Sequence, residues 1–328
     1  MAARCRVPAL NSAEVKMYLT YFDGQWTEGN TPLFGAMDHS VWLGSSVFDG
    51  ARAIRGQVPD LALHLARVIR SAESVGLICP HSVTEMAQLC AEGISKFPKD
   101  AELYIRPLVF GTDGLLIPVP EKSRFALTLF DAPMPPFSGF SACLSTLRRP
   151  EPSMAPTDAK ASCLYPNSTR ALREAKGRGY DNAVMCDSKG MVAEFATANV
   201  FFVTKSGAVV TPIPNGTFLS GITRARVIEL LAHEGVVVEE RTVRPSELDT
   251  ATEIFNTGNF GKVTPCIRYE LRTLLIGPIT TLAREKYLAF SALSAIVQRD
   301  TKACVHPPSS ARTDCISRRS RYRFLVSD

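Results

Sequence analysis

The stretch of residues 194–224 constrains the fold of this chain more than any other part of the sequence. Two runs of β-branched and aromatic residues, 200–204 and 208–211, are separated by a short turn sequence that ends in glycine, and this pattern predicts a β-hairpin. A helix is then predicted to begin near Thr223 and to end at Gly235. The stretch therefore places a carboxylate, at the start of the hairpin, close to the N-terminus of a helix.

The start of this predicted helix has the composition of an anion site. Gly221 stands between the hydroxyl residues Ser220 and Thr223, where the first backbone N–H groups of a helix have no partner within the helix. Those donors, together with the helix dipole, suit a phosphate group. An ordinary cap made by a Ser or Thr side chain explains the same residues, so the helix start alone leaves both interpretations open.

Taken as a whole, the stretch resembles the signature of the class IV aminotransferases, which depend on pyridoxal phosphate. That signature is a Glu, four residues, an Asn, an apolar residue and an aromatic residue, followed later by Leu-x-Gly-Ile-x-Arg. The matching positions are Glu194, Asn199, Val200, Phe201, Leu219, Gly221, Ile222 and Arg224. The resemblance implies pyridoxal 5′-phosphate as cofactor and the class IV fold, which is like that of D-amino acid aminotransferase and combines α+β and α/β features in two domains.

The composition is that of an ordinary globular protein. A chain of 328 residues with 45% hydrophobic residues is long enough for two domains. The net charge is +5, but residues 299–328 hold seven Lys or Arg against three Asp or Glu, so most of the positive excess lies there. Because the rest of the chain is almost neutral, the basic balance does not indicate nucleic-acid binding.

The nine cysteines are scattered, without a Cys-x-x-Cys pair or paired histidines. Such an odd, unclustered set indicates reduced thiols and predicts neither a disulfide framework nor a metal site. The first ten residues lack the apolar core of a signal peptide, and no apolar run approaches the roughly 20 residues of a membrane span. We therefore expect a cytoplasmic protein that binds no membrane.

Proline marks the predicted boundary between the domains. Three prolines fall within residues 131–139, which excludes both a helix and a central strand there. We predict a small N-terminal α/β domain at 1–130, an interdomain linker at 131–139 and a large cofactor-binding domain at 140–298. The basic segment 299–328 is expected to be a poorly ordered tail.

Periodicity and turn residues predict the elements of each domain. In the first we expect antiparallel strands within 18–55, helices at 61–75 and 82–97, and strands at 103–111 and 125–130. In the second we expect, besides the hairpin and the helix after Thr223, strands at 142–147, 236–243 and 253–257 and a helix at 167–176. Ser82 and Glu85 predict a capping box at the start of one helix.

The resemblance assigns the chemistry to Lys160, Tyr165 and Glu194. Lys160 matches the lysine that binds pyridoxal phosphate covalently and moves a proton during the reaction, which requires a pKa lowered by burial and nearby positive charge. Tyr165 matches the tyrosine that hydrogen-bonds the cofactor's phenolic oxygen, and Glu194 matches the carboxylate that binds its pyridine nitrogen. Without the resemblance, Lys160 would be an ordinary surface lysine and Glu194 an exposed residue at a strand end.

A second group of residues is implied to hold the phosphate and the ring of the cofactor. Arg67 matches the phosphate-binding arginine of a His-Leu-x-Arg motif, with Arg70 as its rival on the same helix face. Leu219 would pack on the ring. The remaining expected cofactor contacts are Gly221, Ile222, Thr223 and Asn259.

The substrate side resembles that of branched-chain amino acid aminotransferases. Phe48 and Tyr104 match aromatic walls of an apolar pocket, although core packing also explains them, and Arg52 and Arg106 match arginines that bind carboxylates. Phe260 would narrow this pocket. The chain departs from the subgroup at three places: Leu43 where a Tyr is usual, Cys163-Leu164 where Gly-Asn is frequent, and Asn259-Phe260 where two small residues are expected.

The resemblance, which covers residues 18 to 280, implies transamination between Leu, Ile or Val and 2-oxoglutarate by a homodimer. Arg52 and Arg106 favour this subgroup. The alternatives on the same fold are a D-amino acid or (R)-amine transaminase and an aminodeoxychorismate lyase, and a further alternative is a degenerate member without turnover. The sequence does not determine the preferred amino donor and its stereochemistry, the acceptor, the oligomer size or the role of the tail.

Overall fold

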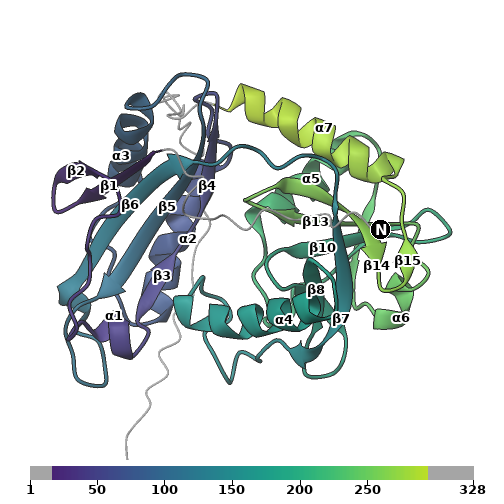
Figure 1. Ribbon diagram of the computed structural model, residues 1–328, viewed down its shortest axis with the longest axis horizontal. Coiled ribbons are helices and arrows are strands. Elements are labelled where there is room, and N and C mark those ends of the chain that lie inside the picture. Colours follow the sequence, from purple (N-terminus) through teal and green to yellow (C-terminus); the bar gives the residue numbers. More distant parts are fainter. Residues whose placement is uncertain (1–16, 295–328) are drawn as a thin grey trace, which may run out of the picture. The chain divides into compact units, whose positions relative to one another are not determined.

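The computed structural model describes residues 17–294, which form two β-sheets flanked by helices (Figure 1). The predicted basic tail at 299–328 lies outside the described residues. No helix in the described part of the chain is both long and apolar enough to cross a membrane. The mixed α/β architecture agrees with the fold class expected from the sequence.

The first sheet is antiparallel and has the strand order β2-β1-β6-β5-β3, with β4 also paired to β5. Its strands are β1 (Tyr18–Phe22), β2 (Gln25–Glu28), β3 (Ser46–Phe48), β4 (Ala51–Ile54), β5 (Glu102–Gly111) and β6 (Ser123–Asp131). Alternate residues of a strand point to opposite faces, and those that pack in the core with helices α2 and α3 include Leu103, Ile105 and Val109 of β5. The opposite face is therefore left for the even-numbered residues of β5.

Two helices cover that core, as predicted. In α2 (Leu61–Ser74) the buried Leu61, Leu65, Val68 and Ala72 recur every three or four residues and form one apolar stripe. In α3 (Val83–Ser95) the predicted capping box is present, because the backbone N–H of Ser82 donates to the N3 carboxylate at 2.7 Å and the Ser82 hydroxyl accepts in return. A short helix α1 (His39–Trp42) and a 3-10 turn η1 (Pro120–Lys122) complete this part.

The second sheet is mixed and has the strand order β12-β11-β10-β13-β14-β7-β8-β9, with β15 paired to β14. The strands are β7 (Phe140–Arg148), β8 (Asn182–Cys186), β9 (Val192–Phe195), β10 (Asn199–Val203), β11 (Val209–Pro212), β12 (Val238–Arg241), β13 (Glu253–Gly258), β14 (Lys262–Tyr269) and β15 (Arg272–Thr273). The predicted hairpin is β10 paired antiparallel with β11. β10 also pairs with β13, which brings the signature strand to the middle of the sheet.

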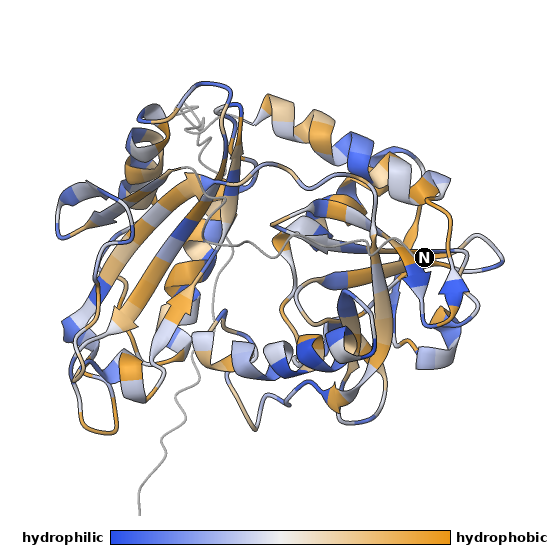
Figure 2. Cartoon of the chain, in the orientation of Figure 1, coloured by the Kyte–Doolittle hydropathy of each residue, from blue (hydrophilic) through white to orange (hydrophobic). Residues whose placement is uncertain are grey.

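Helices α4 (Tyr165–Gly177), α5 (Ile222–His233), α6 (Pro245–Leu248) and α7 (Pro278–Leu293) surround this sheet, with a 3-10 turn η2 (Ser162–Leu164) before α4. The core under α5 and α7 contains Phe201 and Phe255, whose rings stack at 5.1 Å. Helix α4 is mostly hydrophilic along its length and packs on β7 and β8 through small buried residues such as Ala171 and Ala175 (Figure 2). These helices pack against the sheet. The candidate site lies at the ends of its strands.

Strand β14 and helix α7 were not predicted. β14 contains Pro265, which has no backbone N–H and so weakens a strand pattern. Helix α7 has no side-chain cap of its own; instead the distant Glu253 carboxylate accepts from the backbone N–H of Thr280 at 2.8 Å and of Ile279 at 3.2 Å. A cap supplied from another strand leaves no local signal in the sequence.

The first sheet ends at Asp131 and the second begins at Phe140, on either side of the proline-rich segment 131–139. The division into two domains around this segment stays a prediction. Residues of the two sheets also contact each other: the Arg52 guanidinium of β4 donates to the carbonyl of Phe260, after β13, at 2.7 Å.

Candidate active site

Lys160 lies between β7 and α4 and is anchored by residues of the first sheet and its helix. Its backbone N–H donates to the Ser71 hydroxyl of α2 at 3.0 Å, and its carbonyl accepts from the backbone N–H of Phe48 at 3.1 Å. The next residue, Ala161, forms an isolated β-bridge with Val47. The position of Lys160 is therefore set by segments more than 80 residues away in the sequence.

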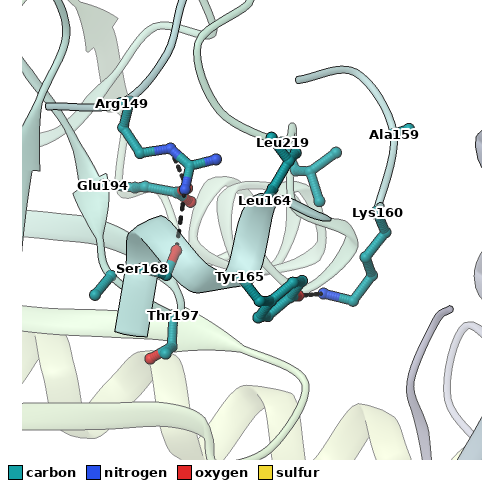
Figure 3. A pocket seen from close by; sticks show the side chains of 10 residues that line it. Arg149, Ala159, Lys160, Leu164, Tyr165, Ser168, Glu194, Thr197 and Leu219 are labelled. Atoms are coloured by element: carbon teal, nitrogen blue, oxygen red, sulfur yellow. Dashed lines mark hydrogen bonds and ion pairs between the residues drawn. The ribbon is translucent and has the colours of Figure 1, made fainter. Parts of the chain in front are cut away.

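The Lys160 side chain points at Tyr165 (Figure 3). Its Nζ lies 2.6 Å from the tyrosine Oη and 5.0 Å from the ring centre of Phe48, which packs on Tyr165 at 4.9 Å. Burial lowers the pKa of Lys160, but the attraction of Tyr165 and Asp49 outweighs it, so the pKa is raised above its ordinary value. The lowered pKa expected from the sequence is therefore wrong, because Tyr165 and Asp49 stabilise the charged amine by more than burial destabilises it.

Glu194 lies on β9 and is buried, not an exposed strand-end residue. Its carboxylate is 3.4 Å from Arg149 Nε and accepts from Asn199 Nδ2 at 3.3 Å. Burial raises the pKa of Glu194 to about 7, and the attraction of Arg149 and Lys160 opposes this only in part. A carboxyl group with such a pKa readily shares a proton with a basic ring nitrogen near neutral pH.

Arg149, which the sequence did not single out, holds Glu194 in place. The guanidinium donates to the Thr217 carbonyl at 3.2 Å. It also donates to the Ser168 hydroxyl of α4 at 3.2 Å (Figure 3). It is thus bound on three sides by groups from β9, α4 and the loop before α5. An arginine that follows a strand carries no sequence signal for this role, since the three partners meet only in the folded chain.

These residues line one common cavity, whose volume is about 60 Å³. Four residues predicted for the site line it: Lys160, Tyr165, Glu194 and Leu219. The other lining residues are Arg149, Ala159, Leu164, Ser168, Ala196 and Thr197. The predicted lysine, tyrosine and carboxylate therefore converge on a common space.

The signature residues also hold one another. Asn199 donates from Nδ2 to the Leu219 carbonyl at 3.1 Å as well as to Glu194, which ties the loop before α5 to the carboxylate. Its Oδ1 occupies the place where a side chain at Gly221 would have its Cβ, so that position requires glycine. Arg224 is buried and pairs with Glu240 at 2.7 Å, which fixes α5 to β12.

The start of α5 fits a phosphate better than it fits an ordinary cap. The N-cap residue is Gly221, and no side chain caps the helix, so the Ser or Thr cap considered from the sequence is wrong. The N–H groups of Ile222 and Thr223 fall in the first turn, where helices offer free donors. Nearby on β13 and in the turn after it, Thr257 Oγ1 and Asn259 Nδ2 are buried without a hydrogen-bond partner in the described part of the chain.

Arg67 is part of a buried charged cluster beside this site. Asp49, which the sequence did not single out, accepts from Arg67 Nε at 2.6 Å and Nη2 at 2.8 Å and from His64 Nδ1 at 2.8 Å. Despite burial, these partners hold the pKa of Asp49 well below its usual range. The rival Arg70 is exposed, whereas Arg67 lies close enough to Lys160 to oppose the rise in the pKa of that lysine.

Strand register places all four predicted substrate residues of the first sheet on one face. Phe48 pairs with Leu108 and Arg52 pairs with Tyr104, so these side chains and that of Arg106 point away from α2 and α3. On this face Phe48 packs on Tyr165, and Tyr104 approaches Phe260 at 6.4 Å between ring centres. Gly50 leaves the space that the Tyr104 hydroxyl occupies.

The two arginines of this face differ. Arg52 is fully buried and donates to the backbone carbonyls of Phe260, at 2.7 Å, and of Ala132, so the structure does not bring it into the cavity as the resemblance had implied. Burial lowers its pKa to about 10. Arg106 is exposed, with its guanidinium over the rings of Tyr104 and Phe130 at 5.5 and 5.2 Å. Neither arginine lines the cavity around Lys160, and of the two only Arg106 has an exposed guanidinium.

The donor set fits pyridoxal phosphate. A buried lysine amine, a tyrosine hydroxyl 2.6 Å from it and a carboxyl group with a raised pKa suit the ring, while an uncapped helix start and the unpartnered Asn259 and Thr257 suit the phosphate. Within residues 17–294 no group of three or more His, Cys, Asp or Glu side chains could hold a metal ion. The lysine, tyrosine and carboxyl groups, with the free donors at the helix start, suit a cofactor that carries a phosphate.

Comparison with known proteins gives the same result. The sequence profile of the family described as "Amino-transferase class IV" matches residues 46–269. An aminotransferase from Brucella abortus bound to the cofactor PLP is 44% identical, with a TM-score of 0.83, over 84% of this chain and 100% of the other. A branched-chain aminotransferase from Thermoproteus uzoniensis with norvaline is 30% identical, with a TM-score of 0.77, over 84% and 95%.

Among curated proteins, a probable branched-chain-amino-acid aminotransferase from Aquifex aeolicus is 33% identical over 87% of this chain and 96% of its own length. The chain belongs to the class IV aminotransferases, is branched-chain-aminotransferase-like within them, and uses pyridoxal 5′-phosphate as its cofactor.

Proposed function

We propose that this enzyme transfers an amino group between a branched-chain L-amino acid (Leu, Ile or Val) and 2-oxoglutarate. The observation that carries the chemistry is the convergence of Lys160, Tyr165 and Glu194 in one cavity, with Arg149 behind the carboxylate. The substrate class is supported by relatives named as branched-chain aminotransferases, one of them with the apolar amino acid norvaline.

Each of these side chains has a defined task. Bound pyridoxal phosphate supplies an electron-withdrawing ring, which eases loss of the proton from the substrate Cα. Lys160 Nζ, in its neutral form, would accept that proton and return it, and Tyr165 Oη, at 2.6 Å, holds the amine in position between transfers. Glu194 would bind the ring nitrogen and share its proton, and Arg149, 3.4 Å from the carboxylate, holds that carboxylate in place.

The aromatic side chains on the face of the first sheet that bears Phe48 and Tyr104 favour an amino donor with an apolar side chain. Phe48 presents its ring 5.0 Å from the Lys160 amine, and on the same face Tyr104 lies 6.4 Å, between ring centres, from Phe260 in the turn after β13. An apolar wall contributes roughly 1 to 3 kcal/mol for each methyl group that it receives, which is enough to prefer a medium aliphatic side chain. Leu43, where a tyrosine hydroxyl is usual, removes one polar anchor.

The acidic acceptor depends on Arg106. The Arg52 guanidinium already donates to two backbone carbonyls. Arg106 is therefore the arginine of the predicted pair that would bind the distal carboxylate of 2-oxoglutarate. A carboxylate in a pocket needs such a paired cation, since unpaired burial is costly.

The test is a panel of amino donors with 2-oxoglutarate as acceptor, followed by the absorbance change when the bound cofactor takes up the amino group. We expect L-Leu, L-Ile and L-Val to react best. Faster reaction with D-alanine or an (R)-amine would instead indicate one of the sibling activities, and cofactor binding without any half-reaction would indicate a protein without turnover.

We also propose that the enzyme works as a homodimer. The loop between β5 and η1 exposes Leu115, Leu116 and Ile117 at 76%, 76% and 80% of their surfaces. An exposed apolar run of this kind suits burial against a second copy. Light scattering on Leu116→Lys tests this. The variant should have the molecular mass of a monomer at concentrations at which the natural chain has that of a dimer.

A further inference from the structure

Lys262 is a buried lysine that the chemistry above does not use. It is the first residue of β14, directly after the turn Asn259-Phe260-Gly261, and only 1% of its surface is exposed. Its φ of 59° lies in the left-handed region that a lysine rarely adopts. Within residues 17–294 its ammonium contacts Asn259 Oδ1, at 2.7 Å, and the ring of Tyr287, whose centre is 5.3 Å away.

This hydrogen bond fixes the orientation of the Asn259 amide. A charged lysine only donates, so the oxygen of the amide must face Lys262 and the NH₂ group must face the other way. That NH₂ group, Nδ2, is buried and has no partner in the described part of the chain, and the same is true of Thr257 Oγ1 two residues earlier. Asn259 Nδ2 and Thr257 Oγ1 can therefore each donate a hydrogen bond to a bound ligand.

These donors lie next to the start of α5. Thr257 of β13 pairs in register with Asn199 of β10, and the Asn199 side chain holds the Leu219 carbonyl in the segment that leads into α5. Helix α5 itself packs on β13. The unpartnered Asn259 and Thr257 atoms are therefore beside the helix start whose N–H groups suit the cofactor phosphate.

The charge of Lys262 also favours an anion here. Burial, together with repulsion from Arg52 of β4, lowers the pKa of Lys262 to about 7, and Asp60 before α2 opposes this. His64 of α2 faces the same region, and its pKa is lowered in part by the lysine charge. Helix α7 presents the Tyr287 ring and also Arg284, whose guanidinium donates to the carbonyls of Gly261 at 3.3 Å and Val263 at 2.8 Å, on either side of Lys262. A phosphate dianion held by the Asn259 amide favours the charged form of Lys262, so that the two stabilise each other.

We propose that Lys262 is a positioning residue of the cofactor-phosphate site, which holds the Asn259 amide so that Nδ2 donates to the phosphate. The proposal rests on the assignment of Asn259 to the phosphate and not on the choice of substrate.

The test compares the affinities of cofactor-free protein for pyridoxal 5′-phosphate and for pyridoxal, which lacks the phosphate. Lys262→Met keeps the length of the side chain and removes the donor. We expect it to weaken binding of the phosphorylated cofactor by about tenfold to a hundredfold, the range for a hydrogen bond to a charged group, and to leave pyridoxal binding unchanged. Lys286→Met is the control and should change neither affinity, because it removes a partly exposed lysine of α7 that pairs with Glu234 at 2.7 Å.

A double-mutant cycle decides whether Lys262 acts through Asn259. Asn259→Ala should weaken phosphate-dependent binding as much as Lys262→Met, and the double variant should be no weaker than Asn259→Ala alone. Additive losses, equal weakening of pyridoxal binding, or an Asn259→Ala variant with full affinity would overturn the proposal. Lys262→Gln, whose amide can still donate to Asn259, should keep most of the affinity. Lys262→Leu, which also lacks the donor, replaces Lys262→Met in the cycle if Lys262→Met does not fold. The donor panel tests the proposed substrates separately.

Discussion

Burial of the Glu194 carboxylate should make the cofactor-free protein less stable as the pH rises from 5 to 8. The carboxyl group is held by Arg149 at 3.4 Å, yet burial dominates and raises its pKa from 4.5 to about 7. A group whose pKa is raised by folding contributes stability below its unfolded pKa, and this contribution is lost as the pH rises through the folded pKa. The rise to about 7 corresponds to about 3 kcal/mol, since each pKa unit is worth about 1.4 kcal/mol.

Glu194→Gln isolates this effect, because glutamine has nearly the same shape and cannot become charged. We expect the free energy of unfolding of the Gln variant, relative to the natural chain, to increase by about 3 kcal/mol between pH 4.5 and pH 8. Urea unfolding of cofactor-free protein at one fixed protein concentration measures it. With cofactor bound, the same variant should keep its affinity but slow proton removal from the substrate in single-turnover experiments, because the charge that holds the ring-nitrogen proton is lost.

Glu239→Gln is the matched control. Glu239 forms an exposed pair with Arg241 at 3.1 Å, so its removal should change stability by less than about 1 kcal/mol at every pH. If the difference between Glu194→Gln and the natural chain does not vary with pH, or if it favours the natural chain as the pH rises, then the attraction of Arg149 exceeds the cost of burial and the reasoning fails.

The remaining predictions concern the catalytic lysine, the acceptor site, the signature glycine and the tail. Lys160→Ala should abolish transamination and the absorbance of the covalently bound cofactor while circular dichroism shows a folded protein; retention of most turnover would contradict the assignment. Arg106→Ala should lower the rate with 2-oxoglutarate at least about tenfold more than the rate with an apolar 2-oxo acid, whereas equal losses would mean a structural role. Gly221→Ala should destabilise the protein by about 1 to 3 kcal/mol in urea unfolding, because its Cβ would overlap Asn199 Oδ1. Ending the chain near Arg299 removes residues outside the described structure and should leave cofactor affinity and activity largely intact; loss of both in a soluble protein would contradict this.

The parts of the site that could be predicted are those whose spacing is local. Glu194, Asn199 and Gly221 act within one hairpin and the helix that follows, so one stretch of sequence contains their mutual contacts. The family resemblance also drew attention to Lys160 and Tyr165, five residues apart, whose side chains meet at 2.6 Å.

The parts that could not be predicted depend on distant segments. Arg149 and Asp49 hold Glu194 and Arg67, but each does so across tertiary contacts that no local pattern encodes. The pKa of Lys160 was expected to fall, and it rises because Asp49 and Tyr165 both face the amine. Helix α7 was missed for the same reason, since its cap is the Glu253 carboxylate on β13.

The family resemblance assigns Arg52 to substrate binding, but in the structure its guanidinium links two parts of the chain. Its donors bind the backbone carbonyls of Phe260, in the turn after β13, and of Ala132, in the proline-rich segment, so it joins the first sheet to the second. Lys160 is anchored to the first sheet and its helix α2, whereas Glu194 belongs to the second. In the proposed mechanism these two groups act at opposite ends of one cofactor ring. The contacts between the two parts of the chain, those of Arg52 and the pair of Arg226 with Asp60 at 2.6 Å, would then help to set the distance on which catalysis depends.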